Sequence, residues 1–195
     1  MYKKYFKRIM DITVALVIMP FILIIVLIVG ILIYSEDKGS IFYNAQRLGL
    51  NGKVFKMFKF RTMKMNAPDI RNDDGSTFNS ENDPRLTKIG RFLRTTSIDE
   101  LPQLLNVLIG DMSLVGPRPD LPEHIKQYDS HEMNKLNVRP GITGYNQAYF
   151  RNTIPWKDRI KNDLLYIDHL TFLMDIKVIL KTIERVLRRK DVYIE

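Results

Sequence analysis

The chain has 195 residues, enough for one domain with a modest core, and contains no cysteine. The lack of cysteine excludes disulfides, thiolate catalysis and thiolate metal sites. A formal net charge of +8 at pH 7 implies anionic partners, and nucleic acid, a membrane surface or a nucleotide-linked substrate all fit this charge.

The N-terminus predicts a membrane-embedded segment. Four basic residues stand within the first eight, and residues 12–34 are apolar except for Thr13 and two helix breakers, Pro20 and Gly30. This apolar run is too long for a secretory signal and no small-residue cleavage site follows it, so we expect it to stay on the mature protein. As a helix rising about 1.5 Å per residue it reaches roughly 33 Å, enough to span a bilayer once.

Two arrangements of this helix remain open from the residues alone. A crossing helix would place one basic flank outside the cell, because the segment that follows is also rich in Lys and Arg. A helix bent at Pro20 that enters and leaves on the same face would keep both flanks in the cytoplasm, and the backbone hydrogen bond that proline lacks favours a bend. Prolines are also common in true spanning helices, so the pattern decides for neither.

The next predicted elements are a β-hairpin and a polar loop. Residues 40–43 and 54–60 alternate or run apolar and aromatic, and the Asn51-Gly52 dipeptide between them is typical of a hairpin turn. Residues 66–84 contain few large apolar side chains and many Asp, Asn, Gly and Pro, which predicts a polar loop.

A helix is expected to resume near Arg85. Four basic residues recur on one face of it at three-residue spacing: Arg85, Lys88, Arg91 and Arg94. Such a face suits either solvent or anionic lipid headgroups, and solvent is the simpler interpretation for all but Arg94.

The most informative stretch is residues 92–119, FLRTTSIDELPQLLNVLIGDMSLVGPRP. Asp99 and Glu100 precede an apolar run with helical spacing, so a helix is expected to begin at or near the two acids. Either Ser97 is its N-cap and Glu100 completes a capping box, or Asp99 is the cap. In both cases the acids lie where unpaired N–H groups and the positive end of the helix dipole favour anions.

Cations accompany these acids. Arg94 precedes them, and a Pro-Arg-Pro loop after the helix holds Arg118 in a restricted geometry because it cannot be helical. Cations for phosphate oxygens beside a carboxylate for metal or nucleophile are the groups that phosphoryl chemistry uses. From spacing alone, capping of a helix is the simpler interpretation of the two acids.

The last third of the chain predicts helices and one glycine-containing loop. Residues 121–136 have a helical pattern, and residues 175–189 predict an amphipathic basic helix that either lies on a membrane or closes the fold. In the loop at residues 139–144, the glycines permit close approach of a ligand and Arg139 can pair with phosphate. The sequence has no glycine-rich nucleotide fingerprint, P-loop, Ser-His-Asp order or zinc signature.

Several motifs, taken in order, resemble the signature of the bacterial monotopic phosphoglycosyl transferases, the small polyprenyl-phosphate sugar-1-phosphate transferases. The resemblance covers nearly the whole chain and is carried by Lys7-Arg8 with Asp11, Phe58–Met63, Ser97–Leu104, Gly110–Ser113, Gly116–Pro119 and Arg139–Gly144. Each motif alone is weak, whereas all of them in this order are highly specific.

The resemblance implies an α+β fold that is mainly α. Residues 1–36 would form a re-entrant membrane helix and residues 37–195 a cytoplasmic catalytic domain, in which a small β-hairpin and amphipathic interfacial helices surround the N-terminus of a catalytic helix. The family breaks its membrane helix at a Ser-Pro pair, whereas this chain has Met19-Pro20 about one turn earlier, which leaves the bend angle open. The implied location is the cytoplasmic face of the bacterial inner membrane.

The resemblance also implies a reaction. A sugar-1-phosphate would pass from a UDP-sugar to polyprenyl phosphate, such as undecaprenyl phosphate, with release of UMP and a covalent phosphosugar on Asp99. Asp99 and Glu100 would be the catalytic pair and would bind Mg²⁺. Nucleic acid is not an expected partner.

The family likeness assigns further residues to ligands. Lys59, Arg94 and Arg118 would bind phosphate oxygens, with Arg61 as a neighbour; Arg139 and Arg151 would lie on the nucleotide-sugar side, and Arg8 would meet a lipid headgroup. Tyr149-Phe150 stands where the family often has Asn-Gly, which suggests a difference in sugar specificity.

Two other classes of function remain as alternatives. A membrane-attached phosphohydrolase would use the same site with water as acceptor, and a non-enzymatic basic adaptor would bind anionic lipid or nucleic acid. Acceptor dependence separates the transferase from the hydrolase. Asp99→Asn separates both from the adaptor, which has no activity to lose.

Overall fold

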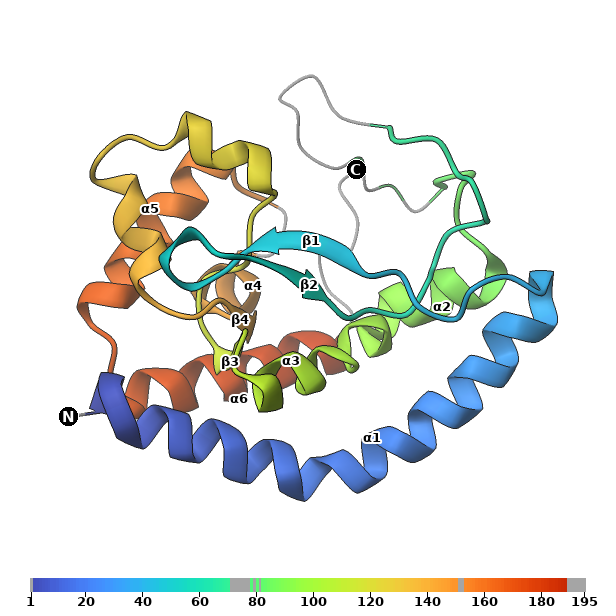
Figure 1. The fold of residues 1–195 in the computed structure, drawn as a ribbon, viewed down its shortest axis with the longest axis horizontal. Coiled ribbons are helices and arrows are strands. Elements are labelled where there is room, and N and C mark those ends of the chain that lie inside the picture. The colour runs from blue at the N-terminus through green and yellow to red at the C-terminus, as the bar shows by residue number, and fades with distance from the viewer. Residues whose placement is uncertain (1, 71–77, 79, 81, 151–152, 189–195) are drawn as a thin grey trace.

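The computed structural model of the protein describes residues 2–70, 78, 80, 82–150 and 153–188. In these residues the fold is mainly helical with two small sheets, as predicted for the fold class (Figure 1). The α-helices are α1 (Lys7–Asp37), α2 (Lys88–Thr96), α3 (Gln103–Ile109), α4 (Tyr145–Tyr149), α5 (Trp156–Asp168) and α6 (Phe172–Arg188). The strands are β1 (Ala45–Leu48), β2 (Val54–Met57), β3 (Ser113–Val115) and β4 (Gly141–Thr143). A π-helical turn, η1 (Tyr2–Phe6), precedes α1, and four 3₁₀ segments are η2 (Leu50–Gly52), η3 (Ile98–Glu100), η4 (Pro122–Gln127) and η5 (Glu132–Asn137).

The longest element, α1, runs along one side of the domain (Figure 1). It is a single helix of 31 residues that includes Pro20, and by length and composition alone it could cross a membrane. It bends near its middle, so that both of its ends turn toward the rest of the domain (Figure 1). A proline inside a helix removes a backbone hydrogen bond, which is a sufficient physical cause of such a bend.

Buried polar contacts fix the first turns of α1 to the domain. Lys7 Nζ lies 2.5 Å from Asp175 Oδ2 of α6, and the hydroxyls of Tyr2 and Tyr166 donate to the same carboxylate at 2.5 and 2.6 Å. Asp11 accepts a hydrogen bond from a β3 backbone N–H at 3.1 Å. Because a buried charge is costly without partners, these contacts favour one position of α1 on the domain.

The last turn of α1 is attached as well. The Glu36 carboxylate accepts from the first two N–H groups of α2 at 2.7 and 3.1 Å and so caps that helix. Asp37 receives two hydrogen bonds of 2.6 Å from the guanidinium of Arg61. Arg61, which the family likeness placed beside the phosphate site, therefore anchors the end of α1.

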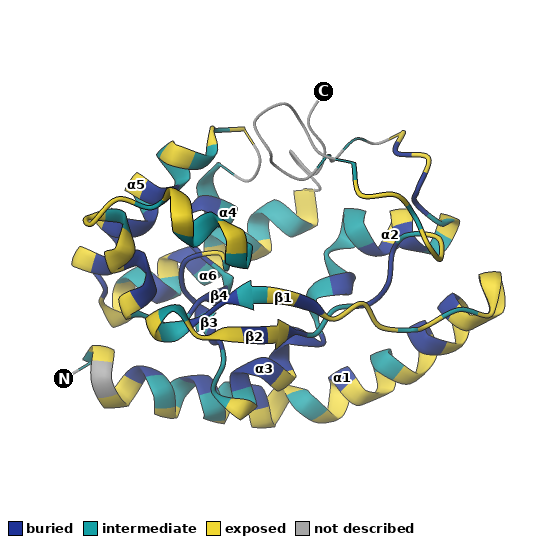
Figure 2. Cartoon of the chain, turned by 45° about the horizontal axis from the view of Figure 1, so that its top comes forward, coloured by how far each residue is buried: buried dark blue, intermediate teal, exposed yellow. Residues whose placement is uncertain are grey.

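Between these ends, α1 has one packed face and one exposed face (Figure 2). Ala15 and Ile22 belong to a core cluster with residues of β2 and α3, and Val29 and Ile33 pack with Phe60 and α2. The exposed face carries large apolar side chains: Leu16, Val17, Phe21, Leu23, Ile24, Leu27, Ile28 and Ile31. A continuous apolar surface of this kind is typical of a region that contacts lipid.

The predicted hairpin is present, with its turn at the predicted dipeptide. β1 and β2 pair antiparallel with Leu48 opposite Val54, and Asn51 and Gly52 have φ values of 56° and 74°. The first strand is residues 45–48, however, and not residues 40–43, which contribute only an isolated bridge at Phe42. The prediction missed β1 because its inward residues flank the polar pair Gln46-Arg47 and give no alternating apolar pattern.

Two other predicted helices have different boundaries. α2 begins at Lys88 with Thr87 as its N-cap, because Arg85 turns inward and pairs with buried Asp83 at 2.7 Å. Arg85 is therefore not part of a basic helical face. Residues 121–136, predicted as one helix, contain the two 3₁₀ segments η4 and η5. The described residues of the polar loop at 66–84 include no helix or strand, as predicted.

The second sheet brings together two loops that were predicted to bind ligands. β3 and β4 pair in parallel, with Ser113 opposite Gly141, and the apolar sides of α5 and α6 pack against Val115. Gly141 permits this approach, because a Cβ there would lie 2.1 Å from the backbone nitrogen of Gly116. The Pro-Arg-Pro loop therefore lies directly beside the loop that contains Arg139.

Candidate active site

The two acids lie in a turn between helices. α2 ends at Ser97, whose φ is 59° and whose side chain makes no capping hydrogen bond. Asp99 and Glu100 belong to the 3₁₀ turn η3, and α3 begins only at Gln103. The predicted capping box is thus wrong, because the left-handed backbone at residue 97 ends one helix instead of starting the next. A dipole argument for the acids is also lost, since α3 is short and begins beyond them.

Backbone hydrogen bonds bring Lys59 to the acids. The chain that continues from β2 passes Lys59, and the N–H of the next residue, Phe60, donates to the carbonyl of Asp99 at 3.0 Å. On the other side, the Lys59 carbonyl accepts from the N–H of Tyr43 at 2.8 Å. The lysine backbone is therefore fixed between the hairpin and the acid turn.

Asn106 on α3 strengthens this placement, and sequence reasoning did not identify it. Its fully buried amide accepts from the Phe58 N–H and donates to the Lys56 carbonyl, both at 2.8 Å. The available signal was a single polar residue within an apolar helical run, because a buried amide needs partners. Asn106 thus ties the helix after the acids to the strand before Lys59.

Four predicted residues from three segments form one ion cluster. Lys59 Nζ lies 2.6 Å from Asp99 Oδ2 and 3.8 Å from Glu100 Oε1. The guanidinium of Arg118 lies 3.0 Å from the same Glu100 oxygen. Two carboxylates and two cations sum to no net formal charge, so within this cluster each carboxylate is balanced by a nearby cation.

Asp99 is the buried member of the cluster, with 3% of its surface exposed. Burial raises the pKa of Asp99 and the charge of Glu100 raises it too, while the charges of Lys59 and Arg94 lower it; the result is a pKa above the usual value. The ammonium of Lys59 covers the carboxylate. An anionic ligand that binds this ammonium would compete with Asp99 for it.

Arg94 acts on the acids from the last turn of α2. Its Nε donates to the hydroxyl of Thr62 at 3.1 Å, and its positive charge lowers the pKa of Asp99. Thr62 was not singled out from the sequence, although it lies within the Phe58–Met63 motif. It orients Arg94 toward the site.

Arg8 and Arg139 lie at the far end of α3. Arg8 donates to the carbonyls of Val107 and Leu108 in the last turn of α3, at 2.6 and 3.1 Å. Arg139 Nε donates to the carbonyl of Gly110, just after this helix, at 2.8 Å. These carbonyls lack partners inside the helix, so both arginines stabilise its C-terminus. α3 has seven residues, so at about 1.5 Å per residue this end lies about 10 Å beyond the start of the helix, and the two acids precede that start. Their predicted contacts with lipid and nucleotide stay predictions, and Arg151 lies outside the described residues.

The two carboxylates are possible metal ligands. Among the residues that the structure describes, no three His, Asp or Glu side chains are placed to hold a metal ion together. The adjacent carboxylates Asp99 and Glu100 nevertheless fit Mg²⁺, which commonly takes one or two carboxylates and completes its shell with substrate phosphates and water. Because the ion cluster is already neutral, two further positive charges are balanced only when an anionic ligand such as a diphosphate enters with them.

Two carboxylates in contact with cations, on a domain with a helix long and apolar enough to cross a membrane, are features of a class of protein that carries out phosphoryl chemistry at a membrane. Comparison with known proteins agrees with this class. Residues 2–189 match the sequence model of a family described as bacterial sugar transferase. The chain therefore belongs to the bacterial sugar transferase family.

Three relatives illustrate the similarity. Galactosyl transferase CpsE of Streptococcus agalactiae is 43% identical over 192 residues, which cover 93% of this chain and 42% of CpsE. The uncharacterized sugar transferase EpsL of Bacillus subtilis is 40% identical over 181 residues, which cover 93% of this chain and 87% of EpsL. Undecaprenyl-phosphate galactose phosphotransferase of Salmonella typhimurium is 37% identical over 206 positions, covering 97% of this chain and 42% of that protein. The chain thus spans less than half of two of these relatives and most of the third.

Proposed function

We propose that this protein transfers a sugar-1-phosphate from a UDP-sugar to polyprenyl phosphate, releasing UMP and forming a polyprenyl-diphosphate-sugar. The observation that carries this proposal is the Lys59–Asp99 pair, a buried carboxylate covered by a cation that a diphosphate can attract. Family membership supports the class of reaction. The name of the Salmonella relative, which contains undecaprenyl phosphate, supports a lipid phosphate as acceptor.

The first step forms a covalent intermediate. The donor's diphosphate oxygens compete for Lys59 and Arg118, so the carboxylate of Asp99 is released from its ion pair. An Asp99 oxygen bonds to the β-phosphorus, and the bond from that phosphorus to the bridging oxygen breaks with its electron pair leaving on UMP. Lys59 and Arg94 stabilise the charge on the phosphoryl oxygens during the displacement.

The second step returns the enzyme to its starting state. An oxygen of polyprenyl phosphate bonds to the same phosphorus, the bond to Asp99 breaks, and the carboxylate is regenerated. Two displacements replace one direct reaction between two anionic substrates, which is the advantage of covalent catalysis here. Glu100 keeps Arg118 beside the reacting phosphate.

The proposal includes Mg²⁺, which Asp99 and Glu100 would hold together with diphosphate oxygens. When bound, the ion supplies charge neutralisation of the diphosphate and polarisation of its phosphorus. Lys59 and Arg118 remain the protein's own cations for the phosphate oxygens.

We also propose that α1 is re-entrant and that the domain lies on the cytoplasmic face of the bacterial inner membrane. Three observations support this: the start, middle and end of α1 all pack on one domain. A helix that crossed the bilayer would carry its middle and one end away from that domain. Residues of α6 with exposed apolar side chains, including Leu173, Leu180 and Leu187, would rest on the same membrane face.

Single cysteines test this topology cleanly, because the chain has none of its own. We expect Tyr5→Cys and Lys38→Cys, which flank the membrane helix, to react with a membrane-impermeant maleimide from the same side. That side should be the one on which Lys161→Cys in the exposed face of α5 also reacts. Labelling of the two flanks from opposite sides of sealed vesicles would contradict the re-entrant arrangement.

A panel of UDP-sugars tests the reaction. With purified protein, undecaprenyl phosphate and one UDP-sugar at a time, we expect at least one donor to release UMP in proportion to the lipid. UDP-galactose comes first, because two relatives carry galactose in their names. Steady UMP release without lipid would establish the phosphohydrolase instead, and no release from any donor would contradict both enzymes.

Metal removal is a further arm of this assay. EDTA should abolish UMP release and added Mg²⁺ should restore it, because the diphosphate would otherwise enter the site with its charge only partly neutralised. Mg²⁺ should bind the free protein more weakly than it binds the protein with UDP present, as isothermal titration can measure. Full activity in EDTA would remove the metal from the proposal and leave the covalent step standing.

A further inference from the structure

We propose that Asp120 is a positioning residue that fixes the Pro-Arg-Pro loop so that Arg118 stays against Glu100. The inference rests on the proposed function, since it assigns Asp120 a purpose in the same reaction. Asp120 lies two residues after Arg118 and contacts none of the reacting groups, so it would act through that arginine alone.

Arg118 needs such support. Its side chain is 49% exposed, and it contacts the site through a hydrogen bond of 3.0 Å to Glu100. An exposed arginine ion pair contributes little by itself, because ordering a long side chain costs rotamer entropy and water screens the charges. A reliable position for the guanidinium must therefore come from the backbone that carries it.

The loop is held first on its N-terminal side. The Gly116 N–H donates to the Thr143 carbonyl, and the Gly141 N–H donates to the Pro117 carbonyl, both at 2.9 Å. Pro117 and Pro119 fix two backbone φ angles around Arg118. One end of the loop is thus attached to β4 and its neighbours.

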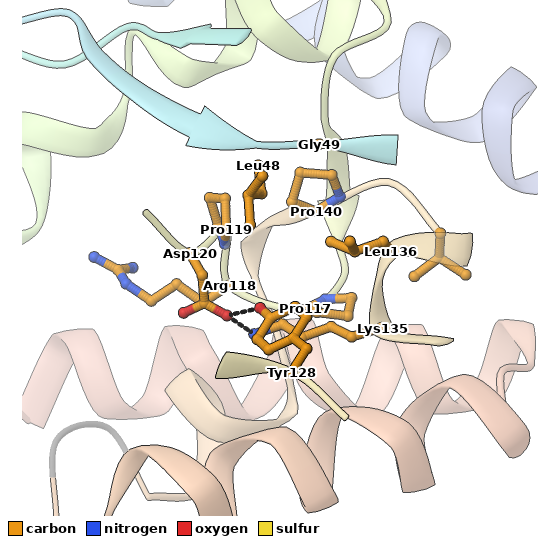
Figure 3. A pocket seen from close by; sticks show the side chains of 11 residues that line it. Leu48, Gly49, Pro117, Arg118, Pro119, Asp120, Tyr128, Lys135, Leu136 and Pro140 are labelled. Atoms are coloured by element: carbon orange, nitrogen blue, oxygen red, sulfur yellow. Dashed lines mark hydrogen bonds and ion pairs between the residues drawn. The ribbon is translucent and has the colours of Figure 1, made fainter. Parts of the chain in front are cut away.

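Asp120 holds the C-terminal side. Its carbonyl accepts from the Leu48 N–H at 2.9 Å, and its carboxylate accepts from Lys135 Nζ and the Tyr128 hydroxyl at 2.5 Å each (Figure 3). The indole N–H of Trp156 donates to the other carboxylate oxygen at 3.1 Å. Asp120 therefore joins the end of the loop to β1, to η5 and to α5.

The partners of Asp120 are fixed in turn. Lys135 is buried and also lies 3.0 Å from Asp163, whose carboxylate accepts from Asn146 at 2.7 Å. Burial would raise the pKa of Asp120. The charge of Lys135 and the hydrogen bonds that the Asp120 carboxylate receives outweigh this effect, so the pKa of Asp120 lies below its usual value. The carboxylate thus stays ionised over the whole pH range in which the enzyme would work.

The side chains of Arg118 and Asp120, on either side of Pro119, point in opposite directions (Figure 3). The loop lines a small cavity, about the size of one water molecule, together with Leu48, Leu136 and Pro140. Figure 3 shows the Asp120 carboxylate turned to Lys135 and Tyr128, whereas the Arg118 guanidinium points away from this cavity. One residue of the pair holds the loop, and the other is left to contact the acid turn.

The test is a double-mutant cycle on the first half-reaction, UMP release without lipid. Asp120→Asn preserves the shape of the side chain and removes its charge, and we expect the rate to fall about 10- to 100-fold from misplacement of Arg118. Arg118→Ala should lower the rate by a similar or larger factor. Because Asp120 acts through Arg118, the double variant should be no slower than Arg118→Ala alone.

Asp175→Asn is the matched control. Asp175 is fully buried, whereas the Asp120 side chain is 14% exposed, and Asp175 likewise receives a lysine ammonium and a tyrosine hydroxyl at 2.5 Å each. It lies on α6 and is not part of the loop. We expect Asp120→Asn and Asp175→Asn each to lower the melting temperature. When each is combined with Arg118→Ala, only the loss of rate caused by Asp175→Asn should multiply with the loss caused by Arg118→Ala. If the Asp120→Asn factor multiplies in the same way, Asp120 is merely structural and the proposal is overturned.

A spectroscopic measurement keeps the test independent of activity. The ¹⁵Nε signal of Arg118, assigned through its loss in Arg118→Lys, should be distinct from that of solvent-averaged arginines in the wild type. It should move to the averaged position in Asp120→Asn and stay in place in Asp175→Asn. An unchanged signal in Asp120→Asn would overturn the proposal, whereas absent UMP release in the wild type would overturn the proposed function only.

Discussion

Replacement of Asp99 by asparagine is expected to abolish both UMP release and covalent labelling of the protein. Loss of a covalent nucleophile costs on the order of 10⁴-fold or more in comparable enzymes, because no neighbouring group supplies the same bond. Asparagine keeps the size of the side chain, and its amide oxygen can still accept a hydrogen bond from Lys59. The fold should therefore survive, and the loss should be one of chemistry.

The measurement uses UDP-sugar labelled in the sugar, with no lipid present. Wild-type protein should gain the mass of one phosphosugar and release at most one equivalent of UMP, and Asp99→Asn should do neither. Asp158→Asn, a change at an exposed carboxylate of α5, should label like the wild type. A labelled Asp99→Asn protein would place the nucleophile elsewhere, and intersecting kinetics with no trapped adduct would indicate direct transfer.

The sequence predicted which residues form the site better than it predicted the local structure around them. The motifs identified Lys59, Asp99, Glu100 and Arg118, and the structure brings these four into one ion cluster, while their chemical roles stay predictions. Spacing failed at the acid turn. A helical apolar pattern gives the face of α3 but not its first residue, which depends on the left-handed backbone at Ser97.

The second difficulty was to predict which group each arginine binds. Arg61 binds the end of α1, and Arg8 and Arg139 bind carbonyls at the end of α3. A guanidinium donates equally well to a carbonyl, a carboxylate or a phosphate, so sequence alone cannot choose its partner. The choice depends on which carbonyls the fold leaves unpaired, a tertiary property.

Polar residues with partners on distant segments were the third difficulty. Asn106 is fully buried and Asp120 mostly buried, and both make hydrogen bonds to other segments, yet neither belongs to a residue pattern that implies chemistry. Their signal is a polar side chain where the fold excludes water, and that exclusion becomes visible only when distant segments are in place.

Replacement of Lys59 by methionine is the second change for which we expect a large effect. Lys59 holds phosphate oxygens in the proposed transition state, and removal of one such cationic or hydrogen-bonding group typically costs about 100- to 1,000-fold. It also lowers the pKa of Asp99, so without it burial and Glu100 raise this pKa further. Less of Asp99 is then ionised at neutral pH, and the first half-reaction loses rate for a second reason.

A pH profile of UMP release without lipid separates these two effects, the lost contact with phosphate and the higher pKa of Asp99. In the wild type the rate should fall as pH decreases through a pKa above about 3.9, the ordinary value for aspartate, because the folded protein raises it. In Lys59→Met this acid limb should move to higher pH, so part of the loss recovers in alkaline buffer. Lys59→Arg should keep the limb near its wild-type position. Lys56→Met, a change at an exposed lysine of β2 three residues before Lys59, should change neither the rate nor the limb. An acid limb that stays in place in Lys59→Met would mean that Lys59 acts on the substrate alone, and that its pairing with Asp99 does not govern ionisation of the nucleophile.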